Sequence, residues 1–316
     1  MDRLLNALRA AAEPTRLRLL VLCARSELTV TELCHILGQS QPRVSRHLKL
    51  LCEAGLLQRF REGTWALFRL ASDGEGGALA RMLVDRLPAE DRNLALDLAR
   101  LDGIKRQRAE AAAAYFRRNA AQWDRIRALH VDEAEVERAL LRLLPEGEVG
   151  TLLDVGTGTG RMLHLVADRI EQAVGIDSSR EMLAVARANL ERAGLDRCVV
   201  RQADMYQLPW PDASFDAAII HMVLHFAAAP ADAIAEAARV LRPGGRLLVV
   251  DFAPHGLEEL RRDHAHRRLG FAEEEIAEWC RAASLDPLPA IHLAGEPLTV
   301  SIWPVLRAGG AAATAP

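Results

Sequence analysis

Residues 151–160 of the chain, Thr151-Leu152-Leu153-Asp154-Val155-Gly156-Thr157-Gly158-Thr159-Gly160, set the architecture of its second half. A short apolar run that enters a glycine-rich turn is typical of a buried strand followed by a helix. Further apolar runs occur at 172–176, 198–202, 216–220 and 246–252, with helical patterns between them. This alternation predicts an α/β fold, a doubly wound parallel sheet with helices on both faces. Two last runs, 289–293 and 298–306, predict a final antiparallel hairpin.

The glycine-rich turn has the chemistry of a ligand-binding loop. Glycines let the backbone approach a ligand closely, and the N-terminus of the following helix favours anionic groups. The spacing is G-x-G-x-G, with Arg161 where the dinucleotide-binding pattern G-x-G-x-x-G has its third glycine. A tight turn without any ligand is the alternative interpretation of these glycines.

Two acidic residues follow the next two strands at equivalent places. Asp177 ends the strand in "AVGIDSS", where a carboxylate can accept hydrogen bonds from two ribose hydroxyls. Asp204, in "QADMYQLPW", is placed to accept from an adenine amino group while Met205 packs on the ring. The alternative for each aspartate is a capping role.

These features together resemble the class I S-adenosylmethionine-dependent methyltransferases, and "LRPGGRLLVVDF" at 241–252 is their usual entry to the fifth strand. The resemblance covers about 110–306 and implies a Rossmann-like fold of seven strands that binds S-adenosylmethionine or S-adenosylhomocysteine. By it, Asp154 and Gly156–Gly160 hold the methionine part, Asp177 the ribose, and Asp204 with Met205 the adenine. The cofactor-binding residues are then Asp154, Gly156, Thr157, Gly158, Gly160, Asp177, Ser178, Asp204, Met205 and Tyr115, the last forming a lid with Asn119 and Trp123.

Methyl transfer by in-line displacement needs positioning, and also a base if the acceptor holds a proton. The segment "IIHMVLHF" occupies the usual acceptor side, which makes His221 and His225 the catalytic candidates. Further candidates are Asp251, His264 and His266. A structural role is the alternative for each histidine. Only Cys198 and Cys280 are available in this part of the chain, which argues against arsenite as the acceptor.

The first 70 residues have a different organisation. Helical patterns cover 2–25, Thr29-x-x-Glu32 is a capping box, and a further helix runs from Gln41 to about Ala54. Residues 57–61 and 64–68 then alternate as two strands joined by a Gly turn. This order predicts a winged helix-turn-helix, with mixed α and β structure.

The helix from Gln41 has two distinct faces. On a helical wheel Val44, Leu48 and Leu51 form the apolar side, and the polar side faces away from them. Arginines on such a face reach guanine edges or phosphates, and arginines on a wing reach phosphates or a minor groove. The predicted DNA-binding residues are Ser40, Gln41, Arg43, Ser45, Arg46, His47, Lys49, Arg59 and Arg61. A solvated charged face is the alternative.

The stretch "TVTELCHILGQSQPRVSRHLKLLCEAGLLQRFREGTWALFRL", with the helices before it, resembles ArsR-type bacterial repressors over about residues 3–95. The resemblance implies a homodimer on a palindromic double-stranded DNA operator. Metal-sensing members have a Cys-x-Cys in the helix before the recognition helix. This chain has Cys34-His35-Ile36 there, and a lone thiol is a poor soft-metal site, so we expect no metal.

Composition agrees with two functional parts. The 316 residues have a net charge of −3, but residues 1–70 contain 11 basic and 6 acidic residues, a net charge of +5. A basic head on an acidic body indicates that the N-terminal part binds a polyanion. Five dispersed cysteines and the absence of a signal or membrane segment favour the reducing cytoplasm. We expect a winged-helix domain at 1–101, a helical connector and lid at 102–145, a methyltransferase-like domain at 146–307 and a disordered tail at 308–316.

Three functions compete on this evidence. The first is a repressor that senses S-adenosylmethionine or S-adenosylhomocysteine, as some fused ArsR-type regulators of methionine-cycle genes do. The second is an active small-molecule methyltransferase with a regulatory DNA-binding domain. The third, a metal or thiol sensor, has only Cys34 in its favour.

Overall fold

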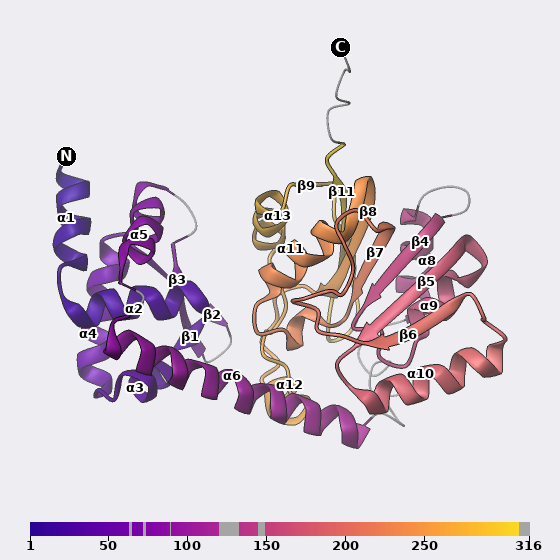
Figure 1. Cartoon of the computed structure of the whole chain (residues 1–316), viewed down its shortest axis with the longest axis horizontal. Coiled ribbons are helices and arrows are strands. Elements are labelled where there is room, and N and C mark those ends of the chain that lie inside the picture. The colour runs from indigo at the N-terminus through magenta and orange to yellow at the C-terminus, as the bar shows by residue number, and fades with distance from the viewer. Residues whose placement is uncertain (63–64, 72–73, 89, 120–132, 145–148, 310–316) are drawn as a thin grey trace, which may run out of the picture. The chain divides into compact units, whose positions relative to one another are not determined.

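The computed structural model of the chain describes residues 1–62, 65–71, 74–88, 90–119, 133–144 and 149–309 (Figure 1). The chain divides into two compact units, Met1–Glu110 and Ala111–Pro316, and each has its own hydrophobic core. Of the tail predicted at 308–316, residues 310–316 lie outside the described part of the chain.

The first unit is a helical domain closed by a small sheet. Its elements are α1 (Asp2–Ala11), α2 (Pro14–Arg25), β1 (Leu28–Thr29), α3 (Val30–Leu37), α4 (Gln41–Glu53), β2 (Leu57–Glu62), β3 (Trp65–Leu70), α5 (Gly74–Arg86) and the start of α6 (Arg92–Asn119). The strands pair antiparallel in the order β1-β3-β2. Helix, turn, helix and hairpin follow one another as predicted, which confirms the winged helix-turn-helix.

Local signals in the sequence place the helix boundaries of this unit. The Thr29 hydroxyl accepts from the Glu32 amide at 3.3 Å and the Glu32 carboxylate accepts from the Thr29 amide at 2.9 Å, so the predicted capping box at α3 is confirmed. Gly38 and Gly55 follow α3 and α4 with φ of 64° and 69°, the left-handed conformation that ends helices cheaply only at glycine. The predicted apolar side of α4 is buried at Val44, Leu48 and Leu51.

The second unit is built around one large sheet. Its elements are α8 (Glu133–Leu143), β4 (Val149–Val155), α9 (Arg161–Val166), β5 (Ile170–Asp177), α10 (Arg180–Ala193), β6 (Cys198–Gln202), β7 (Phe215–His221), η3 (Leu224–Phe226), α11 (Pro230–Val240), β8 (Leu241–Phe252), α12 (Glu259–Asp263), α13 (Glu273–Ala282), β9 (Leu285–Pro287), β10 (Ile291–Leu293) and β11 (Val300–Arg307). Every strand predicted from the sequence is present.

The sheet has the doubly wound topology that the alternation of strands and helices predicts. Its order is β10-β11-β8-β7-β4-β5-β6, and the strands from β4 to β8 are parallel. Leu152 and Leu153, neighbours on β4, enter two different core clusters, one under α8, α9 and α10 and the other under α11 and α13. Helices therefore cover both faces, and the order reverses between β4 and β7, where ligands bind in such folds.

Two details of the architecture were not predicted. The three-residue strand β9 pairs with β11 beside the seven strands of the main order, and the two-residue strand β1 pairs with β3. Strands this short are below the length at which an alternating pattern can be recognised.

Helix α6 is continuous from Arg92 to Asn119. Residues 101 and 102, between which the sequence predicts a domain boundary, therefore both lie inside this helix.

Candidate ligand-binding and DNA-binding sites

The glycine-rich turn forms a tight loop between β4 and α9. Gly156, Gly158 and Gly160 all have positive φ, at 73°, 52° and 81°. A Cβ on Gly156 would lie 2.5 Å from a methyl carbon of Val223, so only glycine lets this loop approach the segment after β7. Inside the loop the Thr157 hydroxyl donates to buried Asp154 at 2.5 Å. This hydrogen bond ties the loop to the end of β4.

Asp177 joins the end of β5 to this loop. One carboxylate oxygen accepts from the Gly158 amide at 3.0 Å and the other from the Ser179 amide at 2.8 Å. Burial raises the pKa of Asp177 above its ordinary value, although the backbone amides that donate to the carboxylate oppose this shift. The next residue, Ser178, is exposed. The loop after β4 and the carboxylate after β5 thus meet at one edge of the sheet.

The third predicted element lies beside Asp177. The Ala203 amide donates to the Asp177 carbonyl at 3.2 Å, which brings the loop after β6 to the same edge. Asp204 is exposed, and one of its carboxylate oxygens accepts from the Tyr206 amide at 2.9 Å. Met205 is half-buried. The Tyr206 hydroxyl, which the sequence reasoning did not single out, accepts from the amides of Ala228 and Ala229.

His221 ends β7 and lines a small cavity of about 20 Å³ at the same edge. The cavity wall consists of Glu133, Val136, Glu137, Met162, His221, Met222 and Val300. Met222 has a φ of 53°, a strained conformation for a residue with a side chain. Strained backbone of this kind concentrates at functional sites, and here it follows the strand next to the point where the strand order reverses.

His225 lies in a different environment, inside an aromatic cluster. Its side chain is 3% exposed, and its Nδ1 lies 2.8 Å from a carboxylate oxygen of Asp251, which is fully buried. The His225 ring stacks on His266 with centroids 4.1 Å apart and also contacts Phe226 and Phe252. Three of the five predicted base candidates thus meet here, and His264 lies nearby in sequence and is half-buried.

An ion pair beside the glycine-rich loop was missed by the sequence reasoning. Both oxygens of Glu137 on α8 accept from Arg161 at 2.6 Å, one from Nε and one from Nη2. In the sequence Arg161 stands out only because it replaces a glycine of the dinucleotide-binding pattern. Nothing local indicates that its partner lies 24 positions earlier.

Most of the predicted lid lies outside the residues and side chains that the structure describes. Tyr115 and Asn119 lie in α6, but the structure does not describe their side chains, and Trp123 lies in the undescribed range 120–132.

The polar face of α4 is exposed on the surface of the first unit. Seven of the predicted DNA-binding residues are exposed: Ser40, Gln41, Arg43, Ser45, Arg46, Lys49 and Arg59. His47 is half-buried instead, with its Nδ1 3.7 Å from a carboxylate oxygen of Glu13, and burial lowers its pKa. Arg61 is placed on β2, but its side chain is not described.

The cysteines are poorly suited to metal binding or redox chemistry. Burial raises the pKa of each of the five thiols, and that of Cys280 to about 12. In the part of the chain that the structure describes, no group of three His, Cys, Asp or Glu side chains could hold a metal ion. No helix among the described residues is long and apolar enough to cross a membrane.

Two segments of the chain match known protein families. Residues 13–59 match the family model for bacterial regulatory proteins of the arsR family, and residues 153–249 match a methyltransferase domain. The chain is 39% identical over 103 residues to phosphatidylethanolamine N-methyltransferase of Cereibacter sphaeroides, which covers 32% of this chain and 50% of the relative. It is 34% identical over 159 residues to demethylmenaquinone methyltransferase of Deinococcus radiodurans, which covers 48% and 64%.

A solved structure agrees on the fold. Geranyl diphosphate C-methyltransferase from Streptomyces coelicolor A3(2), in complex with Mg²⁺, geranyl diphosphate and S-adenosyl-L-homocysteine, superposes with a TM-score of 0.50 at 15% identity, covering 55% of this chain and 77% of that one. The chain spans about half the length of the curated relatives it matches. It therefore joins a helix-turn-helix domain of the ArsR family to a domain of the class I methyltransferase fold.

Proposed function

We propose that this protein is a transcriptional repressor whose methyltransferase domain binds S-adenosylmethionine or S-adenosylhomocysteine as an effector. The observation behind the proposal is that one chain contains both an ArsR-family helix-turn-helix and a methyltransferase domain. The methyltransferase domain and the ligand bound to its solved neighbour point to this cofactor. A regulator of chromosomal genes would act in the cytoplasm.

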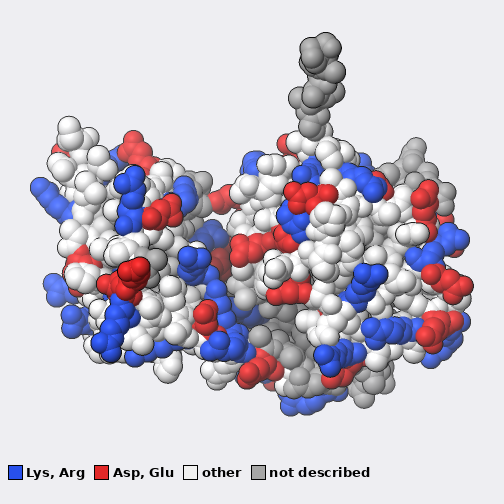
Figure 2. Space-filling model, in the orientation of Figure 1, with Lys and Arg blue, Asp and Glu red and all other residues white. Residues whose placement is uncertain are grey.

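The exposed face of α4 supports binding to double-stranded DNA. Arg43, Arg46 and Lys49 project from it, with Arg59 on the first wing strand. Such residues combine phosphate contacts, which supply affinity, with base contacts, which supply specificity. On the faces of both units seen in Figure 2, Lys and Arg are intermixed with Asp and Glu.

Exposed apolar side chains on α1 support a homodimer on a palindromic operator. Leu4, Leu5 and Leu8 are 48%, 40% and 40% exposed, and Met82 on α5 is 51% exposed. Helices α1 and α5 contact each other, so these side chains belong to neighbouring elements. Apolar surface of this kind is typical of a protein–protein interface.

Helix α6 is the element that would transmit ligand binding to the DNA-binding helix. Its first half is fixed to the first unit, since Arg18 donates to both oxygens of Asp97 at 2.6 and 2.8 Å and Asp97 is 1% exposed. Arg100 donates to the carbonyl of Ile36 at 2.7 Å, close to the turn that leads into α4. The same helix continues to Asn119, beyond the first unit. A displacement of α6 would therefore reach the base of the recognition helix.

The test is fluorescence anisotropy of labelled DNA from upstream of the protein's own gene, titrated separately with S-adenosylhomocysteine and S-adenosylmethionine. We expect one ligand to change the DNA Kd by about 5- to 150-fold, the usual range of allosteric coupling. Asp177→Ala should bind the same DNA without responding. If calorimetry shows the ligand bound while the DNA Kd stays constant, the sensor proposal is wrong.

The second candidate function is methyl transfer to a small molecule, and the His225–Asp251 pair favours it. A buried carboxylate that holds one ring nitrogen of a histidine is the usual way to orient a general base. The small cavity that Met162 and Met222 line is bordered by His221, the other predicted base, and not by His225. In this role His225 would remove the acceptor's proton, and Asp251 would fix its tautomer.

Turnover of labelled S-adenosylmethionine in a small-molecule extract tests this second function. His225→Gln should lower turnover by about 100-fold or more, the contribution of general-base catalysis. The matched control is His164→Gln, since His164 is an exposed histidine on α9. Equal turnover in both variants would exclude the role of His225.

A further inference from the structure

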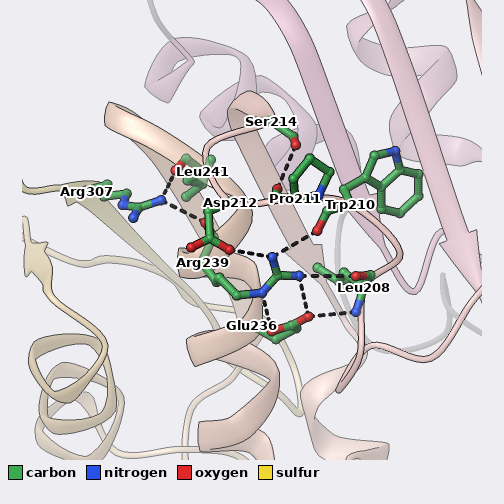
Figure 3. Close-up of polar contacts among 9 residues, drawn as sticks. All are labelled: Leu208, Trp210, Pro211, Asp212, Ser214, Glu236, Arg239, Leu241 and Arg307. Carbon is green, nitrogen blue, oxygen red and sulfur yellow. Dashed lines mark hydrogen bonds and ion pairs between the residues drawn. The ribbon is translucent and has the colours of Figure 1, made fainter.

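The loop that follows β6 is tied to α11 through one arginine (Figure 3). Arg239, near the end of α11, donates from Nε and Nη2 to the two oxygens of Glu236 at 2.9 and 2.7 Å. Its Nη1 also donates to Asp212 at 2.8 Å. The planar guanidinium thus joins an acidic residue of its own helix to one of the loop, a geometry that lysine cannot reproduce.

The same side chain holds the loop backbone. Arg239 donates to the carbonyl of Trp210 at 2.9 Å and to that of Leu208 at 3.1 Å. Glu236 in turn accepts from the Leu208 amide at 2.7 Å. Both backbone groups of Leu208 are therefore fixed by this pair. The hydrogen bond between Arg239 and Glu236 lowers the pKa of the Glu236 carboxyl and raises the pKa of the Arg239 guanidinium. Both groups are therefore charged at neutral pH.

The other end of the loop is anchored independently. The Tyr206 hydroxyl accepts from the amides of Ala228 and Ala229, at 2.7 and 3.2 Å, directly before α11 begins. Asp204 and Met205 thus lie between the contact of Ala203 with Asp177 and the anchors on α11. The arginine side chain is 32% exposed and makes these contacts at the surface, whereas Leu208 and the Trp210–Phe215 ring contact pack on the core.

We propose that Arg239 is a positioning residue for the adenine end of the ligand. Its contacts with Leu208 and Trp210 fix one end of the loop while Tyr206 fixes the other. Together they hold Asp204 where it meets the adenine amino group, and so give the site its preference for adenine over a 6-oxo purine. This inference rests on the proposed binding of S-adenosylmethionine or S-adenosylhomocysteine.

Calorimetry with two ligands tests the inference: S-adenosylhomocysteine, and S-inosylhomocysteine, in which a carbonyl oxygen replaces the adenine amino group. We expect Arg239→Ala to weaken the binding of S-adenosylhomocysteine about tenfold, the value of one orienting hydrogen bond. The affinity for S-inosylhomocysteine should be nearly unchanged. Arg239→Lys should recover part of the preference. The control is Arg242→Ala, which removes an ion pair with Asp216 on β7, 2.5 Å away, and none of the contacts of Arg239 with the loop.

Glu236→Gln gives a second, milder variant. It retains an oxygen for the Leu208 amide but removes the charge, and it should shift the preference in the same direction. Unchanged selectivity in folded Arg239→Ala and Glu236→Gln overturns the inference while leaving ligand binding intact. If the unaltered protein binds no S-adenosylhomocysteine, the proposed function fails, and this inference fails with it.

Discussion

Asp177 lies at a strand end and accepts one backbone hydrogen bond at each carboxylate oxygen, and its removal should be costly. Asp177→Ala removes the acceptor of the Gly158 and Ser179 amides and of the proposed ribose hydroxyls. We expect calorimetry to show S-adenosylhomocysteine bound at least tenfold more weakly, about 1.4 kcal/mol or more. Asp168→Ala, at an exposed aspartate before β5, is the control. Equal affinities in the two variants would exclude the ribose role.

The raised pKa of Asp177 also predicts a pH dependence. The ionised carboxylate accepts hydrogen bonds, whereas the protonated form loses part of that capacity. Because burial raises this pKa, protonation begins at a higher pH than for an ordinary aspartate. Ligand affinity should therefore fall as the pH is lowered, at a higher pH than an ordinary aspartate would require. Asp177→Asn should bind weakly at every pH, and a parallel pH profile for this variant would assign the titration to another group.

Arg46 is the residue on the recognition helix whose loss we expect to matter for DNA alone. It is exposed on α4, and an arginine contact to a guanine or phosphate contributes about 1–3 kcal/mol. Arg46→Ala should weaken operator binding about tenfold or more and flatten its salt dependence. Affinity for S-adenosylhomocysteine should be unchanged. Arg25→Ala, an exposed arginine at the end of α2, should bind DNA normally, and equal DNA affinity in both variants would refute the assignment.

At the scale of elements, α6 is informative because its partners were not predicted. Apolar residues Leu98, Leu101 and Ile104 pack on the core of the first unit, and the Arg18–Asp97 pair adds a charged contact. Periodicity indicates a helix here, but the carboxylate and guanidinium are 79 positions apart in the chain. Only the packing of α2 against α6 makes them partners.

Asp97→Asn tests whether α6 transmits the ligand signal. The amide keeps the volume but loses the charge, and we expect about 1–2 kcal/mol of destabilisation, less than for a fully buried pair because Arg18 remains partly exposed. Anisotropy should show DNA binding retained and its change with ligand reduced. The control is Asp102→Asn, an exposed position on the same helix. A full ligand response in Asp97→Asn would refute α6 as the route.

At the scale of the whole molecule, the dimer is the main expectation. Leu4 and Leu8 lie one helical turn apart on α1, 48% and 40% exposed, so a charge at either position would be buried in a dimer. Leu4→Glu with Leu8→Glu should shift the protein to a monomer in sedimentation and weaken operator binding. Val199→Glu, at a 44% exposed valine of β6, should leave the assembly unchanged. A double variant that sediments like the unaltered protein would place the interface elsewhere.

The main features of both units were readable from local pattern. The capping box at Thr29, the helix-ending Gly38, the glycine-rich turn at 156–160 and Asp177 at a strand end are signals contained within a few residues. Such signals act through backbone conformation and short-range hydrogen bonds, so they persist in any context that forms the element. The order of strands and helices then restricts the topology to very few choices.

Side-chain partners were decided by packing. His221 and His225 lie four positions apart, but one lines a cavity and the other is buried against Asp251, 26 positions away. Glu236 and Leu208 are 28 positions apart, and the clamp they form with Arg239 shows no pattern in the sequence. Periodicity indicates which face of an element is apolar, but it does not specify which residue of another element will lie opposite. That choice depends on how the helices and strands pack together, because burial makes each polar group require a partner within about 3 Å.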